Sequence, residues 1–171
     1  YEIFALPIWF CVMSNHIESQ AEKQPEIQTG SPSVERCLVF ESGALSLFMS
    51  TNYVIEIING HSITPIPMIP SFIKGILNLR GQILPVVDIR LYMGHEEMEF
   101  TRQTCIIVLQ VNSLSLGIIV DSVQQVIDID LANVRSIPVK RQQKLLDGMV
   151  TLEDGRVLMS FDCKALINDP C

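Results

Sequence analysis

The chain has 171 residues, of which 48% are hydrophobic and 18% charged, and its formal net charge is −7 at pH 7. This length is enough for one domain of ordinary size, or two very small ones, with a sizeable core that needs neither disulfides nor metals. The acidic balance argues against nucleic acid or an anionic membrane as the partner. The charged fraction lies below the roughly 25% of average domains, which indicates either a β-rich core or apolar surface kept for partners.

Five cysteines and three histidines are present, but their spacing forms no recognisable site. No two cysteines form a CxxC pair, and no histidine belongs to an HxxH or HExxH motif. An odd number of cysteines without framework spacing is typical of a reducing cytoplasm and not of a secreted, disulfide-linked scaffold. We therefore expect no metal and no cofactor.

Residues 1–33 differ from the rest of the chain. The apolar run over 3–13 is interrupted by a proline, is shorter than the about 20 residues of a transmembrane helix, and lacks the flanks of a signal peptide. Met13 would make an ordinary start, so we expect residues 1–12 to be extraneous; the alternative is an extra strand or anchor packed on the domain. Residues 14–33 are polar and contain Pro and Gly, which predicts a disordered lead-in.

Short strands are predicted to follow. Two apolar runs, 37–40 and 45–49, are separated by a turn with one glycine. Residues 53–58 form a short apolar connector. Residues 63–70 carry three prolines, so they are expected to be extended but cannot form a central strand.

A β-hairpin is predicted next, with strands at 76–79 and 83–87 and a tip at 80–82. Gly81 supplies the positive φ that a tight turn needs. Arg80 is the only cation on this otherwise apolar hairpin, and nothing in the hairpin resembles catalytic machinery.

After this hairpin, Asp88 is placed to cap a short helical turn and Gly94 to end it. Residues 95–102 are rich in glutamate and are interpreted as a solvated link. The second half then contains apolar runs at 105–111 and 114–120, a second connector at 121–130, a hairpin of 149–152 and 157–161 with an Asp-Gly tip, and a last short helix capped by Asp162.

The two halves of the chain resemble each other, which predicts an internal duplication. Leu45 matches Leu114 at an offset of 69 (114 − 45), and Asp88 matches Asp162 at an offset of 74 (162 − 88). The offset only increases between these points, as loop insertions would produce. Each half has too few short strands for a sandwich of its own, but enough for a small closed barrel. We therefore expect two small β-barrels packed together with a groove between them.

No residue pattern indicates catalysis. Asp88, Asp121 and Asp162 are the carboxylates closest to strand ends, and capping or turn roles explain them better than acid–base chemistry. The chain contains no GxSxG motif and no P-loop. The alternative is a small β-barrel enzyme that uses Asp88 or Asp121.

The remaining candidates are interaction residues. Arg80 is either a solvated, strand-pairing arginine or a planar donor that ties loops together or meets a partner. Val54, Ile57 and Ile58 are core residues by default, but some of them could line the groove, which would suit a helix. The second hairpin carries Glu153-Asp154-Gly155 where the first has Arg80-Gly81, so we expect that the fold does not require Arg80.

Three motifs make the chain similar to a known family. The runs IPSFIKGILNLRGQILPVVDIRLYMG, LGIIVDSVQQVIDI and LLDGMVTLEDGRVLMSFDCKALI resemble the CheW family of bacterial chemotaxis coupling proteins. The resemblance covers about residues 34–168, and its most specific part joins Asn78-Leu79-Arg80-Gly81 to Pro85-Val86-Val87-Asp88. The run ALSLFMSTN departs from the family, because Phe48 stands where a small residue is common and the usual glycine and acidic residues are missing.

The resemblance implies a mainly β fold of two SH3-like five-stranded β-barrels, with short connecting helices and a short C-terminal helix. The domain would span 34–171, in two intertwined halves of roughly 34–100 and 101–171. Its implied role is that of a non-catalytic cytoplasmic adaptor in membrane receptor arrays. The cytoplasmic helical tip of a chemoreceptor would bind between the barrels, and the barrel ends would bind the regulatory domain of the histidine kinase CheA.

The resemblance also implies a partner-binding set. Val54, Gly75 and Arg80 match positions associated with receptor coupling, and Glu56, Lys74, Ile57 and Asn78 complete the predicted set. The arginine that matches Arg80 is described in the family as organising the loops between the barrels, so we expect Arg80 to be partly structural and partly interfacial. A twitching-motility or other chemosensory pathway is the alternative within the same adaptor class.

Overall fold

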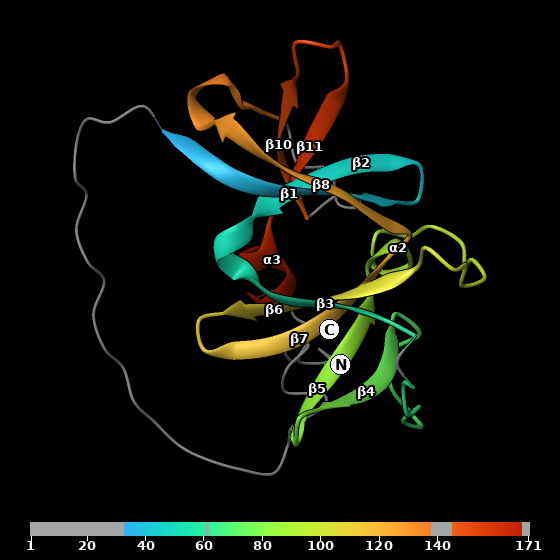
Figure 1. The fold of residues 1–171 in the computed structure, drawn as a ribbon. Helices are drawn as coiled ribbons and strands as arrows, with labels where there is room; N and C mark the ends of the chain where they lie inside the picture. The colour runs from blue at the N-terminus through green and yellow to red at the C-terminus, as the bar shows by residue number, and fades with distance from the viewer. Residues whose placement is uncertain (1–32, 61, 138–144, 169–171) are drawn as a thin grey trace, which may run out of the picture.

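The computed structural model describes residues 33–60, 62–137 and 145–168, drawn as the coloured ribbon in Figure 1. The predictions for residues 1–32 lie outside the described residues. Within the described parts, no helix is long and apolar enough to cross a membrane.

The described chain is mainly β, as predicted. Its first repeat contains β1 (Val34–Ser42), β2 (Leu45–Ser50), the 3-10 helix η1 (Thr51–Tyr53), β3 (Val54–Asn59), β4 (Ile73–Leu79), β5 (Gln82–Asp88) and α2 (Ile89–Tyr92). Its second repeat contains β6 (Cys105–Val111), β7 (Leu114–Val120), β8 (Ser122–Asp130), the 3-10 helix η2 (Leu131–Asn133), β9 (Arg135–Ser136), β10 (Leu146–Thr151), β11 (Val157–Phe161) and α3 (Cys163–Asn168).

The strands form two sheets, which appear one above the other in Figure 1. The five-stranded sheet has the order β3-β6-β7-β5-β4 and is called the first barrel. The other sheet has the order β8-β1-β2-β11-β10-β9 and is called the second barrel; β9, with two residues, is its sixth strand. The predicted two-barrel fold is therefore confirmed.

The two repeats exchange strands between the barrels. Strand β3 follows the β1–β2 hairpin in the chain but pairs antiparallel with β6 of the other repeat. Likewise, β8 follows the β6–β7 hairpin but pairs antiparallel with β1. In both barrels the last hairpin joins the first through a parallel pair, β5 with β7 and β11 with β2. The repeated pairings are those that a duplication predicts. The division near residue 100 separates the repeats along the chain, but each barrel takes strands from both.

The two predicted connectors are in fact strands. Residues 53–58 and 121–130 correspond to β3 and β8, each of which crosses from one barrel to the other. A β-bulge lies in β3 between Val54 and Glu56, where it pairs with β6, and another lies in β8, where Gln124 is the extra residue opposite Val39 and Phe40 of β1. A bulge shifts the alternation of buried and exposed side chains by one residue, so the period of two is hidden in the sequence.

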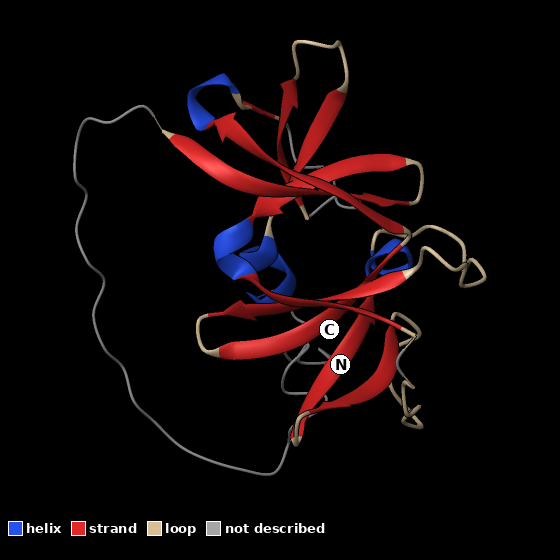
Figure 2. Cartoon of the chain, viewed as in Figure 1, coloured by secondary structure: helices blue, strands red, loops and turns tan. Residues whose placement is uncertain are grey.

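Three apolar cores hold the barrels together. One lies inside the first barrel and includes Ile58, and a second lies inside the second barrel. The largest contains buried side chains from β1, β2, β6, β7, α2 and α3, and thus belongs to both barrels. Figure 2 shows α2 and α3 between the two sheets. Along this seam Ile58 is buried inside the first barrel, and Val54 packs against the shared core. The groove expected between the barrels stays a prediction.

The cysteines of β1 and β6 are buried among apolar side chains, as expected for thiols that act as small hydrophobic groups. Burial raises the pKa of the Cys37 thiol to about 11. Burial also raises the pKa of Cys163, at the start of α3, to about 12.

Candidate partner-binding site

The tip of the first hairpin is a two-residue turn and not the three-residue tip predicted. Leu79 pairs with Gln82, and between them Arg80 has φ 51° and Gly81 has φ 87°. Two successive positive φ angles are those of a type I′ turn, whose twist matches that of the flanking strands. The side-chain Oδ1 of Asn78 accepts a hydrogen bond from the Gly81 amide at 3.0 Å and fixes the turn.

The second hairpin is not an equivalent turn. Thr151 pairs with Val157, so its loop contains residues 152–156 and is longer. Asp154 accepts hydrogen bonds from the amide and the Nε of Arg156, at 2.9 and 2.7 Å. The formation of this hairpin therefore does not show whether the tighter turn tolerates another residue in place of Arg80.

Arg80 lies on the surface, with 79% of its side chain exposed. Its Nη2 is 3.1 Å from Oε1 of Glu56, whose side chain is 29% exposed. Glu56 belongs to β3 and Arg80 to the turn after β4, and β3 and β4 are the two edges of the five-stranded sheet. The ion pair therefore links the edges of the first barrel. Exposed pairs of this kind contribute only about 0.2–1 kcal/mol, so a partner can replace the pair at little cost.

The other predicted residues of β3 differ in exposure. Val54 is half-buried and packs against the shared core. Ile57 is 41% exposed, and its neighbour Ile55, which the sequence analysis did not select, is 51% exposed. These two residues flank Glu56 in the sequence and give β3 exposed apolar side chains.

Two of the three predicted residues of β4, Lys74 and Gly75, have structural roles near its start. The Nζ of Lys74 forms an ion pair with Glu97, in the segment after α2. Gly75 is buried, with φ 138°, and a Cβ at this position would lie 2.1 Å from the carbonyl oxygen of Thr64. Thr64 and Ile76 exchange two backbone hydrogen bonds of 2.8 and 2.9 Å there. The backbone of Thr64 therefore packs so closely against Gly75 that it excludes any side chain there.

A buried ion cluster was missed by the sequence analysis. Arg90, in α2, is fully buried, and its Nε and Nη2 donate to Oδ1 and Oδ2 of Asp88 at 2.9 and 2.7 Å. Its Nη1 donates to Oδ1 of Asp121 at 2.7 Å, and Oδ2 of Asp121 accepts from the Gly43 amide at 2.7 Å. The hydrogen bond to Asp88 is the main cause that raises the pKa of Arg90.

This cluster connects the barrels. Arg90 and Asp88 belong to the first barrel, Asp121 lies where the chain crosses between β7 and β8, and Gly43 lies in the β1–β2 turn of the second barrel. The contact of an arginine with the loops between the barrels is therefore made by Arg90, whereas Arg80 pairs within its own barrel. The available signal was a cation inside the apolar run VVDIRL, since a buried arginine needs a carboxylate partner.

The predicted roles of the three aspartates are largely confirmed. Asp88 caps α2 by accepting from the Arg90 amide at 3.0 Å, and Asp162 caps α3 by accepting from the amides of Lys164 and Ala165 at 2.8 and 3.0 Å. Asp121 holds a turn. Among the described residues, no group of three or more His, Cys, Asp or Glu side chains is arranged to hold a metal.

Comparison with known proteins identifies the family. The profile of the CheW-like domain matches residues 36–171. The chain is 28% identical over 145 residues to the chemotaxis protein CheW of Bacillus subtilis, which covers 84% of this chain and 90% of that protein. It is 31% identical over 134 residues to CheW of Klebsiella aerogenes, covering 77% of this chain and 80% of that protein.

The fold agrees with these matches. The crystal structure of the scaffolding protein TtCheW from Thermoanaerobacter tengcongensis superposes with a TM-score of 0.73 at 28% identity, covering 79% of this chain and 93% of that one. Sequence and structure thus point to the same relatives, over nearly the whole of the described chain. The chain therefore belongs to the CheW family of chemotaxis scaffold proteins.

Proposed function

We propose that this chain is a cytoplasmic adaptor that couples transmembrane chemoreceptors to the histidine kinase CheA in signalling arrays. It would bind the helical tip of the receptor and the regulatory domain of the kinase. Membership of the CheW family supports this role. The observation that carries it is Arg80, a planar donor that is 79% exposed and held by one weak ion pair.

The proposed partner-binding surface is centred on the Arg80–Glu56 pair and the exposed side chains of β3. The arginine can donate to carboxylates or backbone carbonyls of the partner, and Ile57 supplies an apolar contact. The full set is Arg80, Glu56, Ile57, Asn78, Lys74, Val54 and Gly75. Within it, Val54 and Gly75 support the surface through packing, and Asn78 supports it by fixing the turn.

We also propose that the chain is not an enzyme. The two carboxylates of the rival hypothesis, Asp88 and Asp121, are both hydrogen-bonded to Arg90. Asp88 has no exposed side-chain surface, so it cannot meet a substrate. A residue for general acid–base chemistry needs a free oxygen within hydrogen-bond reach of the reacting atom.

A binding titration tests the coupling role. The full chain is titrated with a receptor tip fragment and, separately, with the CheA regulatory domain. Arg80→Ala is expected to weaken receptor binding about tenfold while far-UV CD and melting temperature stay unchanged. Arg156→Ala is the matched control, because the side chain of Arg156 is also exposed, at 53%, and pairs with the carboxylate of Asp154 at a hairpin tip. Absence of binding to both partners would reject the proposal.

A different chemosensory pathway, such as twitching motility, is the second candidate. A relative with a name other than CheW also matches: the chain is 30% identical over 99 residues to the protein FrzA of Myxococcus xanthus, which covers 58% of this chain and 62% of that protein. Deletion of the gene separates the two pathways. Loss of swimming chemotaxis with normal twitching supports the first, and the reverse phenotype supports the second.

A further inference from the structure

The segment between α2 and β6 is held in place at several points, although its glutamates suggested a solvated link. The His95 amide donates to the Arg90 carbonyl at 2.9 Å, and Glu97 pairs with Lys74 of β4. The guanidinium carbon of Arg90 lies 6.0 Å from the ring centroid of Phe100. Such anchors fix the backbone before any partner arrives, which lowers the entropy cost of binding.

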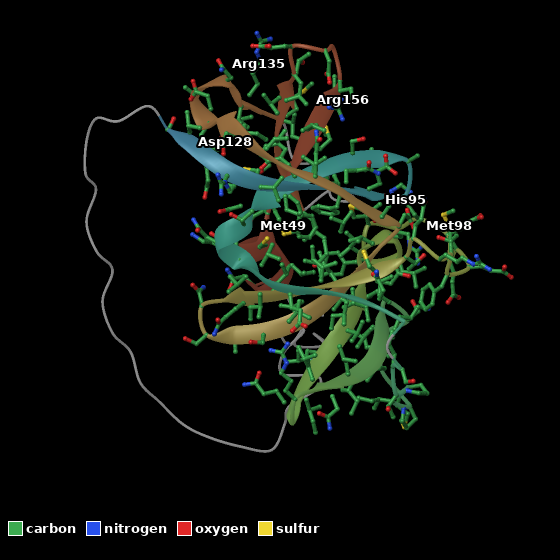
Figure 3. The ribbon with its side chains drawn as sticks, viewed as in Figure 1. Met49, His95, Met98, Asp128, Arg135 and Arg156 are labelled. Carbon is green, nitrogen blue, oxygen red and sulfur yellow. The ribbon has the colours of Figure 1, made fainter. Side chains whose placement is uncertain are left out.

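This fixed segment exposes large apolar side chains. Met98 is 53% and Phe100 57% exposed, and Figure 3 shows Met98 on the outside of the segment that follows α2. Phe100 also borders a hollow of about 120 Å³. The other large side chains around this hollow are apolar: Ile58, Ile63, Ile106 and Ile119.

Carboxylates flank the two apolar side chains. Glu96, Glu97 and Glu99 are all exposed, and within the described part of the chain only Glu97 of these three has an ion-pair partner, Lys74. The position of Phe100 over Arg90 has a structural explanation, since an aromatic ring is attracted to a cation. Met98 makes no such contact with the cluster and, among the described residues, belongs to none of the three apolar cores.

We propose that residues 95–100, called the acidic ledge, form a second docking surface for a cationic, amphipathic segment of a partner protein. Lysines or arginines of that segment would face Glu96 and Glu99, while its apolar side chains would cover Met98 and Phe100, one of them entering the hollow. The choice of a basic partner rests on charge complementarity. The ledge adjoins the Arg80–Glu56 surface through the Lys74–Glu97 ion pair. Its exposed apolar side chains, Met98 and Phe100, are not among the residues of the coupling role, so this inference goes beyond that role.

NMR titration of the ¹⁵N-labelled full chain tests the ledge. The probe is a 14-residue amphipathic peptide of lysine and leucine, compared with a peptide of the same composition in scrambled order. Amide shifts are expected to concentrate on residues 95–104 and on Gly60, Ile63 and Ile106 around the hollow. Met98→Ser is expected to weaken binding of the amphipathic peptide about tenfold, because the lost contact lies at the centre of the surface.

Matched variants separate the ledge from general stickiness of an acidic protein. Met68→Ser removes an equally large, fully exposed methionine elsewhere and is expected to leave the affinity unchanged. Glu99→Gln is expected to weaken binding about threefold and Glu153→Gln not at all. Phe100→Ser also uncovers Arg90, so its effect on binding is interpreted only together with that of Met98→Ser, which leaves the Phe100–Arg90 contact intact. Equal binding of the scrambled peptide, shifts spread over other acidic surface, or unchanged affinity of Met98→Ser would each overturn the proposal.

Discussion

At the scale of single residues, the buried cluster around Arg90 is the feature most sensitive to substitution. Arg90→Met leaves Asp88 as a buried carboxylate without its cation, so we expect a loss of about 3–5 kcal/mol in the free energy of unfolding. Arg90→Met combined with Asp88→Asn should be less destabilised than Arg90→Met alone. The double variant has no fully buried lone charge, since Asp121 keeps 28% of its side chain exposed and its hydrogen bond from the Gly43 amide. Asparagine can still cap α2. Urea unfolding followed by CD measures both.

Asp121→Asn should be milder, because Arg90 keeps its pair of hydrogen bonds with Asp88. We expect about 1–3 kcal/mol for the weakened contacts with Arg90 and Gly43. Asp154→Asn serves as the control, since Asp154 contacts Arg156 in its own exposed loop. An Arg90→Met protein within about 1 kcal/mol of the wild type would show that the cluster is not structural.

Gly75 is the second residue at which the structure makes a sharp prediction. Gly75→Ala places a methyl group 2.1 Å from the carbonyl oxygen of Thr64 and should abolish the Thr64–Ile76 bridge. We expect a loss of about 4 kcal/mol or more, and Gly75→Asp should be worse. Gly60→Ala is the matched control: Gly60 also has a positive φ, but no atom of the described residues lies within 4 Å of its Cβ position, so the loss should be about 1–2 kcal/mol.

This comparison decides how Gly75 relates to partner binding. If Gly75→Asp lowers the melting temperature and the affinity together, the position acts through the fold of the first barrel. A Gly75→Asp protein with wild-type stability and reduced receptor affinity would instead place the residue in direct contact with the partner.

At the scale of elements, a substitution in the β4–β5 turn can distinguish a structural role of Arg80 from an interfacial one. A type I′ turn favours asparagine followed by glycine, because both central residues have positive φ. Arg80→Asn should therefore raise the free energy of unfolding, by about 0.5 kcal/mol, while it weakens receptor binding about tenfold. Thermal unfolding and the receptor titration measure the two effects. A stable variant that binds like the wild type would show that Arg80 is not part of the interface.

The elements also show how far the sequence could predict this structure. Both hairpins and both helix caps were predicted, because turn residues and capping aspartates act over a few positions. The sequence predicts connectors where β3 and β8 lie, because bulges in their pairings disturb the alternation on which a strand prediction depends. The pairing of β3 with β6 depends on which sheet edges meet after the chain has crossed between barrels, and no local pattern encodes that choice.

For the candidate site, too, the sequence predicts local features and not contacts between distant residues. The family motif selected Arg80, and Glu56 was added to the predicted set as a neighbour of matched positions. The structure brings these two side chains together, 24 residues apart in sequence. The motif could not reveal the cluster, because Asp121 lies 31 residues after Arg90 and 78 residues after Gly43. Contacts of that range arise from the exchange of strands between the repeats.

At the scale of the whole molecule, the exchange of strands should make the two barrels one cooperative unit. Residues 54–120 contain every strand of the first barrel in one continuous segment, so this barrel could in principle fold alone. Its outer face, however, includes Ile107, Leu109 and Ile118, which are fully buried against side chains of the second barrel. Removing β1, β2 and α3 would expose that face to water, at about 25 cal/mol for each Å² of apolar surface.

We therefore expect a 54–120 fragment to be unfolded, with a poorly dispersed amide NMR spectrum, whereas the full chain unfolds in one transition. Native-state hydrogen exchange of the full chain is the complementary measurement, and the slowest amides of both barrels should open with the same free energy. A fragment with a dispersed spectrum and a cooperative melt would show that the first barrel's own core suffices. In that case the shared core would serve to fix how the barrels pack and not to fold them.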